Sequence, residues 1–231
     1  MQGWNWSGFF EYLTNPYLME GAVTTLWLTA VSISVGLVLG FVLALMRLSR
    51  FKPLSLAAYA YIWLFRGTPL LVQLIVIYTG LPQVGIRLSV IASALIGLSL
   101  NEAAYLAEII RAGINAVPAG QSNAARALGM RDYQVMRDIV IPQALRIIVP
   151  PIGNSVNGLL KTTSMTSVIS MEELLRRTQV LIQERFLVLE LFAVAALYYL
   201  AMTTAWDFVQ RAIERRFGRA YERIGASIEQ R

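Results

Sequence analysis

The 231-residue sequence has no cysteine and no histidine, and only 15% of its residues are charged. Without cysteine the chain can form neither a disulfide framework nor a thiolate metal site. Without histidine it also lacks the commonest metal ligand and general base. The sequence contains no P-loop motif that would cradle the phosphates of ATP. These absences argue against a metal hydrolase, a histidine-dependent enzyme and a self-contained P-loop ATPase.

Apolar side chains are abundant and make up 56% of the residues. This share is well above that of an ordinary soluble domain and indicates a membrane protein. The net charge of +6 raises the alternative of nucleic-acid binding. The arginines, however, stand between and after the apolar runs and not on a basic face with exposed aromatic residues, so we expect no nucleic-acid partner.

Five apolar runs are candidates for membrane spans, each of which needs roughly 20 helical residues to cross about 30 Å of hydrocarbon. They cover about residues 21–46, 55–81, 88–110, 143–160 and 186–208. The second run is interrupted by Arg-Gly-Thr-Pro at 66–69, where Thr68 is predicted to cap a helix that starts with Pro69. The fourth run is the least regular because it contains prolines, glycines and asparagines.

The basic residues predict the orientation of the spans, since loops rich in lysine and arginine stay in the cytoplasm. No lysine or arginine precedes Arg47, so we expect the N-terminus outside, and the basic cluster after residue 208 places the C-terminus in the cytoplasm. The sequence thus predicts one all-α integral membrane domain over 1–231 with five transmembrane helices. Its other parts are an aromatic-rich periplasmic interfacial helix at 1–18, an external loop at 161–185 and a basic cytoplasmic tail at 209–231.

A polar, helix-prone insert at 119–141 separates the third run from the fourth. It is predicted to form two short helices, 119–128 and 131–140, hinged at Gly129, with Pro118 opening the pair and Pro142 closing it. An insert of this size is too small to be a domain of its own. Its apolar side must therefore pack on the membrane spans or on another protein, and a plain surface loop is the alternative.

Within this insert, the order Ala124, Ala125, Gly129, Ile139, Pro142 resembles the EAA loop of the membrane subunits of ATP-binding-cassette (ABC) importers. In that family the loop is a cytoplasmic coupling helix that sits in a cleft of a separate ATPase subunit, and the resemblance implies the type I ABC importer fold. This chain departs from the pattern at Asn123, which replaces an acidic residue, and at Ile141, which replaces a leucine. The residues that the resemblance assigns to ATPase coupling are Gln121, Asn123, Ala124, Ala125, Gly129, Ile139 and Pro142.

Three further segments resemble the polar amino-acid permeases of this class: FRGTPLLVQL at 65–74, EIIRAGINAVPAGQ at 108–121 and LLKTTSMTSVIS at 159–170. The resemblance implies a multi-pass permease of the bacterial inner membrane that carries a polar L-amino acid. It implies as partners an ABC ATPase subunit dimer with ATP and Mg²⁺, a second permease subunit, identical or homologous, and a periplasmic amino-acid-binding protein. No cofactor is expected in this chain. Many relatives have aspartate where this chain has Thr162, which weakens the expectation of an arginine-like substrate.

Polar residues inside the spans are candidates for a path that replaces the water around a polar solute, because unsatisfied polar groups are costly in hydrocarbon. The candidates are Asn101, Glu102, Ser155, Asn157 and Thr162. The structural alternatives are an interhelical hydrogen bond for Asn101, an ion pair of Glu102 with Arg66, and close packing for Ser155 and Asn157. Glu108 and Arg111, three residues apart, are expected to form a surface pair.

Two other functional classes remain as alternatives. A self-sufficient ion-coupled secondary amino-acid carrier typically has internal repeats and a coupling-ion site, and we find no inverted repeat in the sequence. An intramembrane enzyme needs paired catalytic groups in its spans, and only Glu102 comes near that description.

Overall fold

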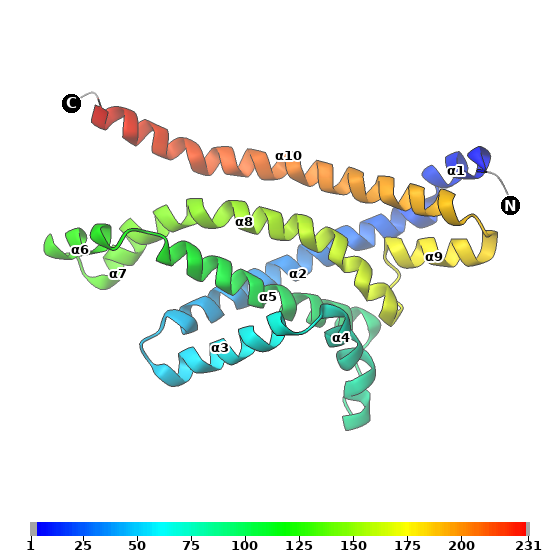
Figure 1. Cartoon of the computed structure of the whole chain (residues 1–231), viewed down its shortest axis with the longest axis horizontal. Helices are drawn as coiled ribbons and strands as arrows, with labels where there is room; N and C mark the ends of the chain where they lie inside the picture. The colour runs from blue at the N-terminus through cyan, green and yellow to red at the C-terminus, as the bar shows by residue number, and fades with distance from the viewer. Residues whose placement is uncertain (1–3, 230–231) are drawn as a thin grey trace.

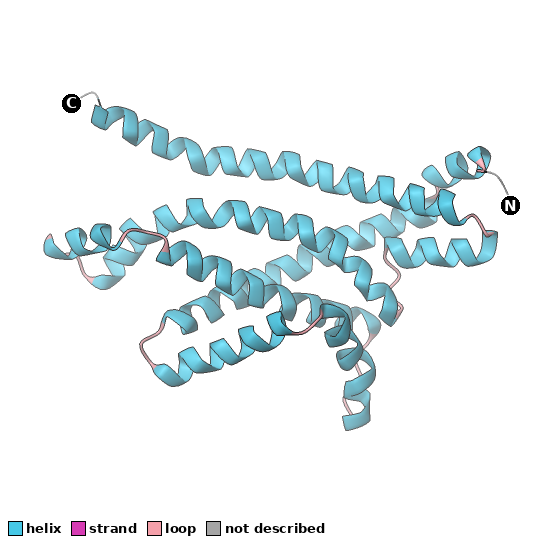
Figure 2. Cartoon of the chain, in the orientation of Figure 1, coloured by secondary structure: helices cyan, strands magenta, loops and turns pink. Residues whose placement is uncertain are grey.

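Helices joined by short turns make up the described part of the chain, which in this computed structural model is residues 4–229 for the backbone and 4–217 for the side chains (Figure 1, Figure 2). Within these residues no β-strand occurs. The α-helices are α1 (Trp6–Leu13), α2 (Pro16–Leu48), α3 (Lys52–Gly67), α4 (Leu70–Ile75), α5 (Val90–Asn115), α6 (Ala119–Ala127), α7 (Asp132–Gln134), α8 (Ile141–Thr162), α9 (Leu174–Arg185) and α10 (Val188–Glu229). Short π-helical or 3-10 segments extend α4 (Val76–Gly80, Leu81–Val84), α7 (Val135–Val140) and α8 (Thr163–Ile169).

Four stretches of helix are long and apolar enough to cross a membrane, and they are Pro16–Leu48, Val90–Asn115, Asp132–Ile169 and Val188–Phe217. The pair of α3 and α4, with its extension, is bent by 102° and passes the same test as a fifth, broken span. Helices suit this environment because they satisfy all their backbone hydrogen bonds internally. The prediction of an all-α, multi-pass membrane protein is confirmed, with four to five spans.

The spans are arranged in a row with one helix behind it. Figure 1 shows α3, α5, α8 and α10 next to one another in this order, while α2 crosses behind them and packs along α5. Gly36 and Gly40 of α2 permit this close approach: a β-carbon at position 40 would lie 3.0 Å from the carbonyl oxygen of Ala103 and 2.9 Å from Cβ of Leu106. Such Gly-x-x-x-Gly contacts are frequent between transmembrane helices and set the distance between α2 and α5.

The two ends of the bundle are closed by different elements. At the end that we call the α6 end, α6 and α7 pack on the ends of α2, α5 and α8. At the opposite end, which we call the α9 end, α1 and α9 pack against α2 and α10. The N-terminal helix α1 therefore lies at the α9 end, whereas the long helix α10 runs towards the α6 end (Figure 1).

A buried carboxylate, Glu173, fixes the start of α9. It accepts hydrogen bonds from the backbone N–H groups of Leu175 (2.9 Å) and Arg176 (2.7 Å) and from the Tyr199 hydroxyl (3.0 Å) of α10. Burial raises the pKa of the Glu173 carboxyl above its usual range, although the three donors oppose this shift. The residue thus caps α9 and ties it to α10.

Several boundaries differ from the sequence-based predictions. The region 161–185, expected as a loop, is mostly helical, because residues 163–169 extend α8 and Glu173 caps α9. The basic stretch predicted from residue 209 on continues α10 without a break to Glu229, on a sequence rich in good helix formers. The interfacial helix predicted at 1–18 covers Trp6–Leu13, and α2 begins at Pro16. Residues 1–3 and 230–231 lie outside the described part.

Candidate functional site

The break between α3 and α4 is the local feature that opens the candidate site. Pro69 has no backbone N–H and disfavours helical geometry at the preceding residue, and Thr68 accordingly has φ −120° and ψ 144°. α3 therefore ends at Gly67, and α4 begins at Leu70 with Pro69 as its N-cap. The predicted N-cap role of Thr68 is wrong, because its hydroxyl donates to the Leu64 carbonyl oxygen (2.8 Å) and so closes α3.

Two side-chain amides satisfy the backbone carbonyl groups that this break frees. Gln73 Nε2 donates to the carbonyl oxygens of Phe65 (2.9 Å) and Thr68 (3.1 Å). Asn101 Nδ2 donates to the same Phe65 oxygen (3.2 Å) and to Gln73 Oε1 (3.1 Å). Asn101 thus links α5 to the break between α3 and α4, as the interpretation of this residue as an interhelical hydrogen bond expects. Sequence reasoning did not single out Gln73, and its polar side chain within an apolar run was the available signal.

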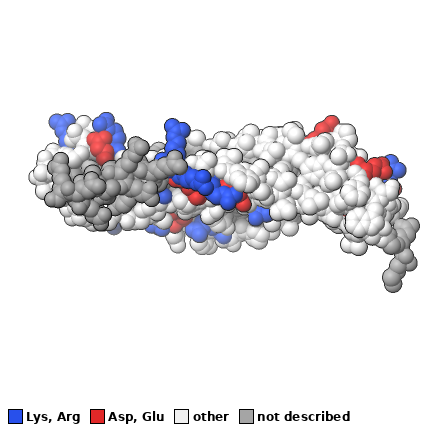
Figure 3. Space-filling view, turned by 90° about the horizontal axis from the view of Figure 1, so that it is seen from above, with Lys and Arg blue, Asp and Glu red and all other residues white. Residues whose placement is uncertain are grey.

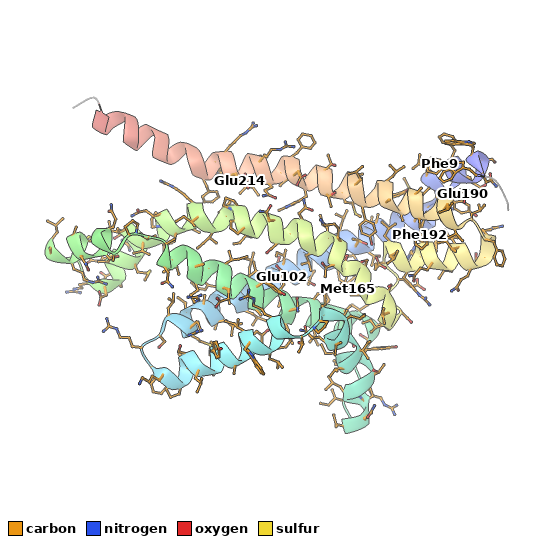
Figure 4. All side chains as sticks on the ribbon, viewed as in Figure 1. Phe9, Glu102, Met165, Glu190, Phe192 and Glu214 are labelled. Carbon is orange, nitrogen blue, oxygen red and sulfur yellow. The ribbon has the colours of Figure 1, made fainter. Side chains whose placement is uncertain are left out.

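An open cavity of about 540 Å³ lies beside the break, between α3, α5 and α8. Such a volume is in the usual range for small-molecule sites. The structure brings four of the five predicted path residues together in its wall, namely Asn101, Glu102, Ser155 and Thr162. Met165 also lines it, and Figure 4 shows Glu102 and Met165 where α5 and the end of α8 approach α4.

Glu102 is the ionisable group that the chain leaves incompletely satisfied in this cavity. Its side chain is 8% exposed and lies against Gly36 of α2. Its carboxyl interacts with Ser155, but the Oε1 atom has no hydrogen-bond partner within the described residues. Because an unsatisfied polar atom in a membrane span is costly, this oxygen is well suited to accept a hydrogen bond from a polar solute.

The alternative ion pair between Arg66 and Glu102 is wrong. The Arg66 guanidinium lies over the ring of Tyr105, 5.3 Å from its centroid, and its Nη1 atom is 3.9 Å from Glu108 Oε2. Arg111 holds the same carboxylate more tightly through Nη2 (2.8 Å) and Nε (3.0 Å), which confirms the predicted pair of Glu108 and Arg111. Arg66 therefore extends along α5 past Glu102, whose side chain packs on α2.

Asn157 lies outside this cavity. Ser155 and Thr162, seven residues apart, share one face of α8, whereas Asn157 is turned by about 200° from Ser155 at about 100° per residue. Its Nδ2 atom donates to Asp207 Oδ1 of α10 at 2.7 Å. Asn157 thus belongs to the contact between α8 and α10.

At the α6 end, residues 119–141 form a unit that we call the coupling segment. α6 ends in a turn in which the N–H of Gly129 donates to the Arg126 carbonyl (2.9 Å) and that of Met130 to the Ala125 carbonyl (3.1 Å). Gly129 has φ +87°, a left-handed conformation that glycine adopts without strain. The Arg126 guanidinium also bonds the Asp132 carboxylate (2.8 Å) across this turn. The predicted hinge at Gly129 is therefore a well-defined turn.

The predicted closure of the segment at Pro142 is wrong. From Asp132 the chain runs through α7 and the π-helical turn Val135–Val140 into α8 without interruption. Pro142 stands in the first turn of α8, where its missing N–H is tolerated because the preceding turn is π-helical. The second half of the coupling segment is consequently one rod with the span that follows it.

The coupling segment is anchored on one side and exposed on the other. Three of its residues, Ala125, Val135 and Val140, are buried against Ala44 of α2 and Ile110 of α5. Of the remaining predicted coupling residues, Ile139 is half-buried, and those that are exposed are Gln121, Asn123, Ala124, Gly129 and Pro142.

Besides Met136, two large apolar side chains of the coupling segment are exposed, and sequence reasoning missed both. Leu128 is 85% exposed and Tyr133 is 59% exposed. Exposed apolar groups of this size, grouped around one turn, are suited to a contact with another protein. The available signal was their position on either side of Gly129.

The comparisons with known proteins agree with this geometry. The family described as "Binding-protein-dependent transport system inner membrane component" matches residues 36–219. The chain is 40% identical to the "Arginine transport system permease protein ArtQ" of Bacillus subtilis, over 87% of this chain and 92% of that protein. It is 37% identical to the "Arginine transport system permease protein ArgU" of Corynebacterium glutamicum, over 94% of this chain and 73% of that protein.

Solved structures show the same fold. A chain in the crystal structure of an amino acid ABC transporter with histidines superposes with a TM-score of 0.88 at 38% identity, covering 93% of this chain and all (100%) of that chain. A chain of the MetNI methionine ABC transporter, at 21% identity and a TM-score of 0.70, shares the fold. Since the family match covers most of the sequence, this chain belongs to the family of inner membrane components of binding-protein-dependent transport systems.

Proposed function

We propose that this chain is the transmembrane subunit of an ABC importer that carries a polar L-amino acid across the bacterial inner membrane. The α6 end then faces the cytoplasm and the α9 end faces outside, as the arginines at the α6 end indicate. ATP and Mg²⁺ bind to a separate ATPase dimer. A second permease subunit, identical or homologous, completes the membrane part, and a periplasmic binding protein delivers the solute.

The observation that carries this proposal is the coupling segment. It presents Leu128 and Tyr133 to the outside, while Ala125 and Val135 anchor it on the ends of the spans. A movement imposed on the exposed side passes directly into α8, because no break separates Asp132 from that helix. This arrangement suits a lever between a soluble motor subunit and the membrane helices.

The substrate class follows from the cavity and the relatives. The cavity at the α3–α4 break offers a carboxyl, amides and hydroxyls to a solute, with Glu102 carrying the unpartnered oxygen. Two relatives are named as arginine permeases and one solved relative as an amino acid transporter. A polar amino acid, with its charged groups, fits such a wall.

The test is ATP hydrolysis by this chain, co-expressed with the ATPase, completed with a second permease subunit where one is needed, and reconstituted in liposomes. Addition of the binding protein and its amino acid should stimulate hydrolysis. Leu128→Asp should remove this stimulation and the co-purification of the ATPase, because it places a charge in an apolar contact. Phe51→Asp is the matched control, since Phe51 is also an exposed apolar residue (65%) but lies on the turn between α2 and α3.

The results separate the proposal from its rival. Normal stimulation in Leu128→Asp, or an equal loss in Phe51→Asp, would contradict the role of the coupling segment. Amino-acid uptake driven by an ion gradient without any ATPase would favour a self-sufficient secondary carrier.

A further inference from the structure

A second polar site lies on the opposite side of α8 from the cavity. Asp207 of α10 is exposed, although it belongs to the membrane-spanning stretch Val188–Phe217. Its Oδ1 atom accepts a hydrogen bond of 2.7 Å from Asn157 Nδ2 of α8, which fixes the orientation of the carboxylate. No other hydrogen bond to this carboxylate is formed within the described residues, so its second oxygen is unoccupied.

The depth of Asp207 in the bundle follows from its neighbour Trp206. A small apolar cavity of about 230 Å³ brings Trp206 of α10 next to Ile33 and Leu37 of α2. These two residues stand at the middle of the 33-residue helix Pro16–Leu48. Asp207 therefore lies level with the middle of α2 and within the membrane-spanning stretch Val188–Phe217, where a charged side chain facing lipid is strongly unfavourable.

No described side chain forms an ion pair with this carboxylate. Arg211, one turn further along α10, donates from Nε to the backbone carbonyl oxygen of Asp207 (3.1 Å), and its guanidinium lies over the Phe208 ring at 4.8 Å. Among the side chains that the structure describes, no lysine or arginine comes within ion-pair distance of the Asp207 carboxylate. The carboxylate is therefore available to a cation that is not among the described side chains.

The surroundings of Asp207 are polar on one side of α10. At about 100° per residue, Thr203, Thr204, Gln210, Arg211 and Glu214 all lie within about 60° of Asp207, whereas Val209 points about 200° away. Figure 3, which looks onto α10, shows positive and negative atoms gathered near the middle of the molecule, with uncharged surface between them and the charged atoms at the α9 end. Figure 4 shows Glu214 on the side of α10 that faces α8.

An exposed face of α8 connects this polar side of α10 to the cavity. Asn154, Lys161 and Met165 are exposed on this face, and Gln210 of α10 donates to Asn154 Oδ1 (3.2 Å). Met165 also lines the cavity that contains Glu102. Lipid does not solvate charged and amide groups such as these, whereas a water-filled transport path does.

We propose that Asp207, positioned by Asn157, lines the transport path and binds the positively charged side chain of a cationic amino acid. This inference rests on the proposed function and names the substrate class of the path. An ammonium or guanidinium group supplies the missing cation, and the free carboxylate oxygen supplies the acceptor. Thr162 has no carboxylate to offer to a cationic solute, and Asp207 provides one.

The first test measures whether Asp207 faces water. The chain contains no cysteine, so only the introduced thiol of this chain can react. Asp207→Cys and Val209→Cys are each assembled with the ATPase in liposomes and treated with a membrane-impermeant trimethylammonium methanethiosulfonate. We expect Asp207→Cys to react about tenfold faster or more, because thiol modification requires water around the thiolate. Val209→Cys is the matched control on the opposite side of the same helix, where the side chain is also exposed (48%). Equal, slow labelling of both variants would overturn the proposal.

The second test measures selectivity with L-arginine and L-glutamine as probes. Asp207→Asn should raise the KM for L-arginine about tenfold, because one charge-assisted hydrogen bond is lost. It should leave the KM for L-glutamine nearly unchanged. Asp207→Glu should restore part of the arginine uptake. Glu184→Gln removes the same charge from the exposed surface of α9 and should change neither value.

The outcomes distinguish this inference from the proposed function. An equal effect of Asp207→Asn on both amino acids, or loss of subunit assembly in that variant, would overturn the cation site and assign Asp207 to the contact with the second permease subunit. Uptake of L-glutamine but not of L-arginine by the unmodified importer would also overturn the cation site and leave the proposed function intact. Absence of any ATP-driven uptake would contradict the proposed function itself.

Discussion

The contact between α2 and α5 gives the sharpest prediction, the effect of Gly40→Ala. A methyl group there would lie 2.9 Å from Cβ of Leu106, 3.0 Å from the Ala103 carbonyl oxygen and 3.1 Å from the Ala107 nitrogen. Two of these three atoms belong to backbone and cannot rotate away, so the helices must separate by several tenths of an ångström. Overpacking of this kind costs about 1–3 kcal/mol.

The assay is thermal unfolding of the purified importer complex. A loss of about 2 kcal/mol corresponds to a Tm decrease of roughly 4–8 °C for a chain of this size. Gly120→Ala is the matched control, because Gly120 is also helical but has nothing within 4 Å of its added β-carbon. We expect the control to leave Tm unchanged or to raise it slightly, since alanine favours helix. An unchanged Tm in Gly40→Ala, or an equal decrease in both variants, would refute the close backbone contact between α2 and α5.

Three further predictions concern the break, the coupling segment and the start of α9. Gln73→Leu leaves the Thr68 carbonyl without its donor and removes one of the two donors to the Phe65 carbonyl, so it should destabilise the complex by about 2–4 kcal/mol. Gln183→Leu, on the exposed surface of α9, should not, and equal Tm values would contradict this. Gly129→Ala should lower Tm by straining a φ of +87°, and Gly129→Asn should do so less, because asparagine tolerates this conformation; equal losses would disagree with a backbone cause. Burial raises the pKa of Glu173, so its contribution to stability is largest at low pH and declines as pH rises above the ordinary pKa of about 4.3. The Tm difference between the unmodified complex and Glu173→Gln should therefore shrink from pH 5 to pH 8. A Tm difference that widens over this range would contradict the direction of the pKa shift.

The helices and the hinge of the coupling segment followed from local patterns in the sequence. Long uncharged runs predict spans because no other structure except a closed barrel satisfies a backbone in lipid. Gly129 predicts a helix end because glycine adopts the left-handed conformation of such a turn with the least strain. Boundaries were less accurate where a tertiary contact extended a helix, as at 163–169 and in α9, whose cap at Glu173 is also held by Tyr199 of α10.

The candidate site was predicted only in part. Asn101, Glu102, Ser155 and Thr162 were recognised as polar residues in apolar runs, and the fold brings these four together. The same signal did not reveal which face of α8 Asn157 occupies or that its partner is Asp207, 50 residues away. The presence of polar residues in apolar runs also gave no reason to choose Glu108 over Glu102 as the partner of Arg66.

The sequence by itself determined that this chain is helical, spans a membrane several times and carries an amphipathic segment between two spans. These properties depend on local backbone hydrogen bonding and on the cost of charge in hydrocarbon, which act over one or two helical turns. The tertiary structure alone decided which polar groups meet: Gln73 with the carbonyls at the break, Glu173 with Tyr199, and Asp207 with Asn157. Such pairs depend on how the helices are rotated and spaced, and close contacts such as that of Gly40 with α5 fix this spacing only after the chain has folded.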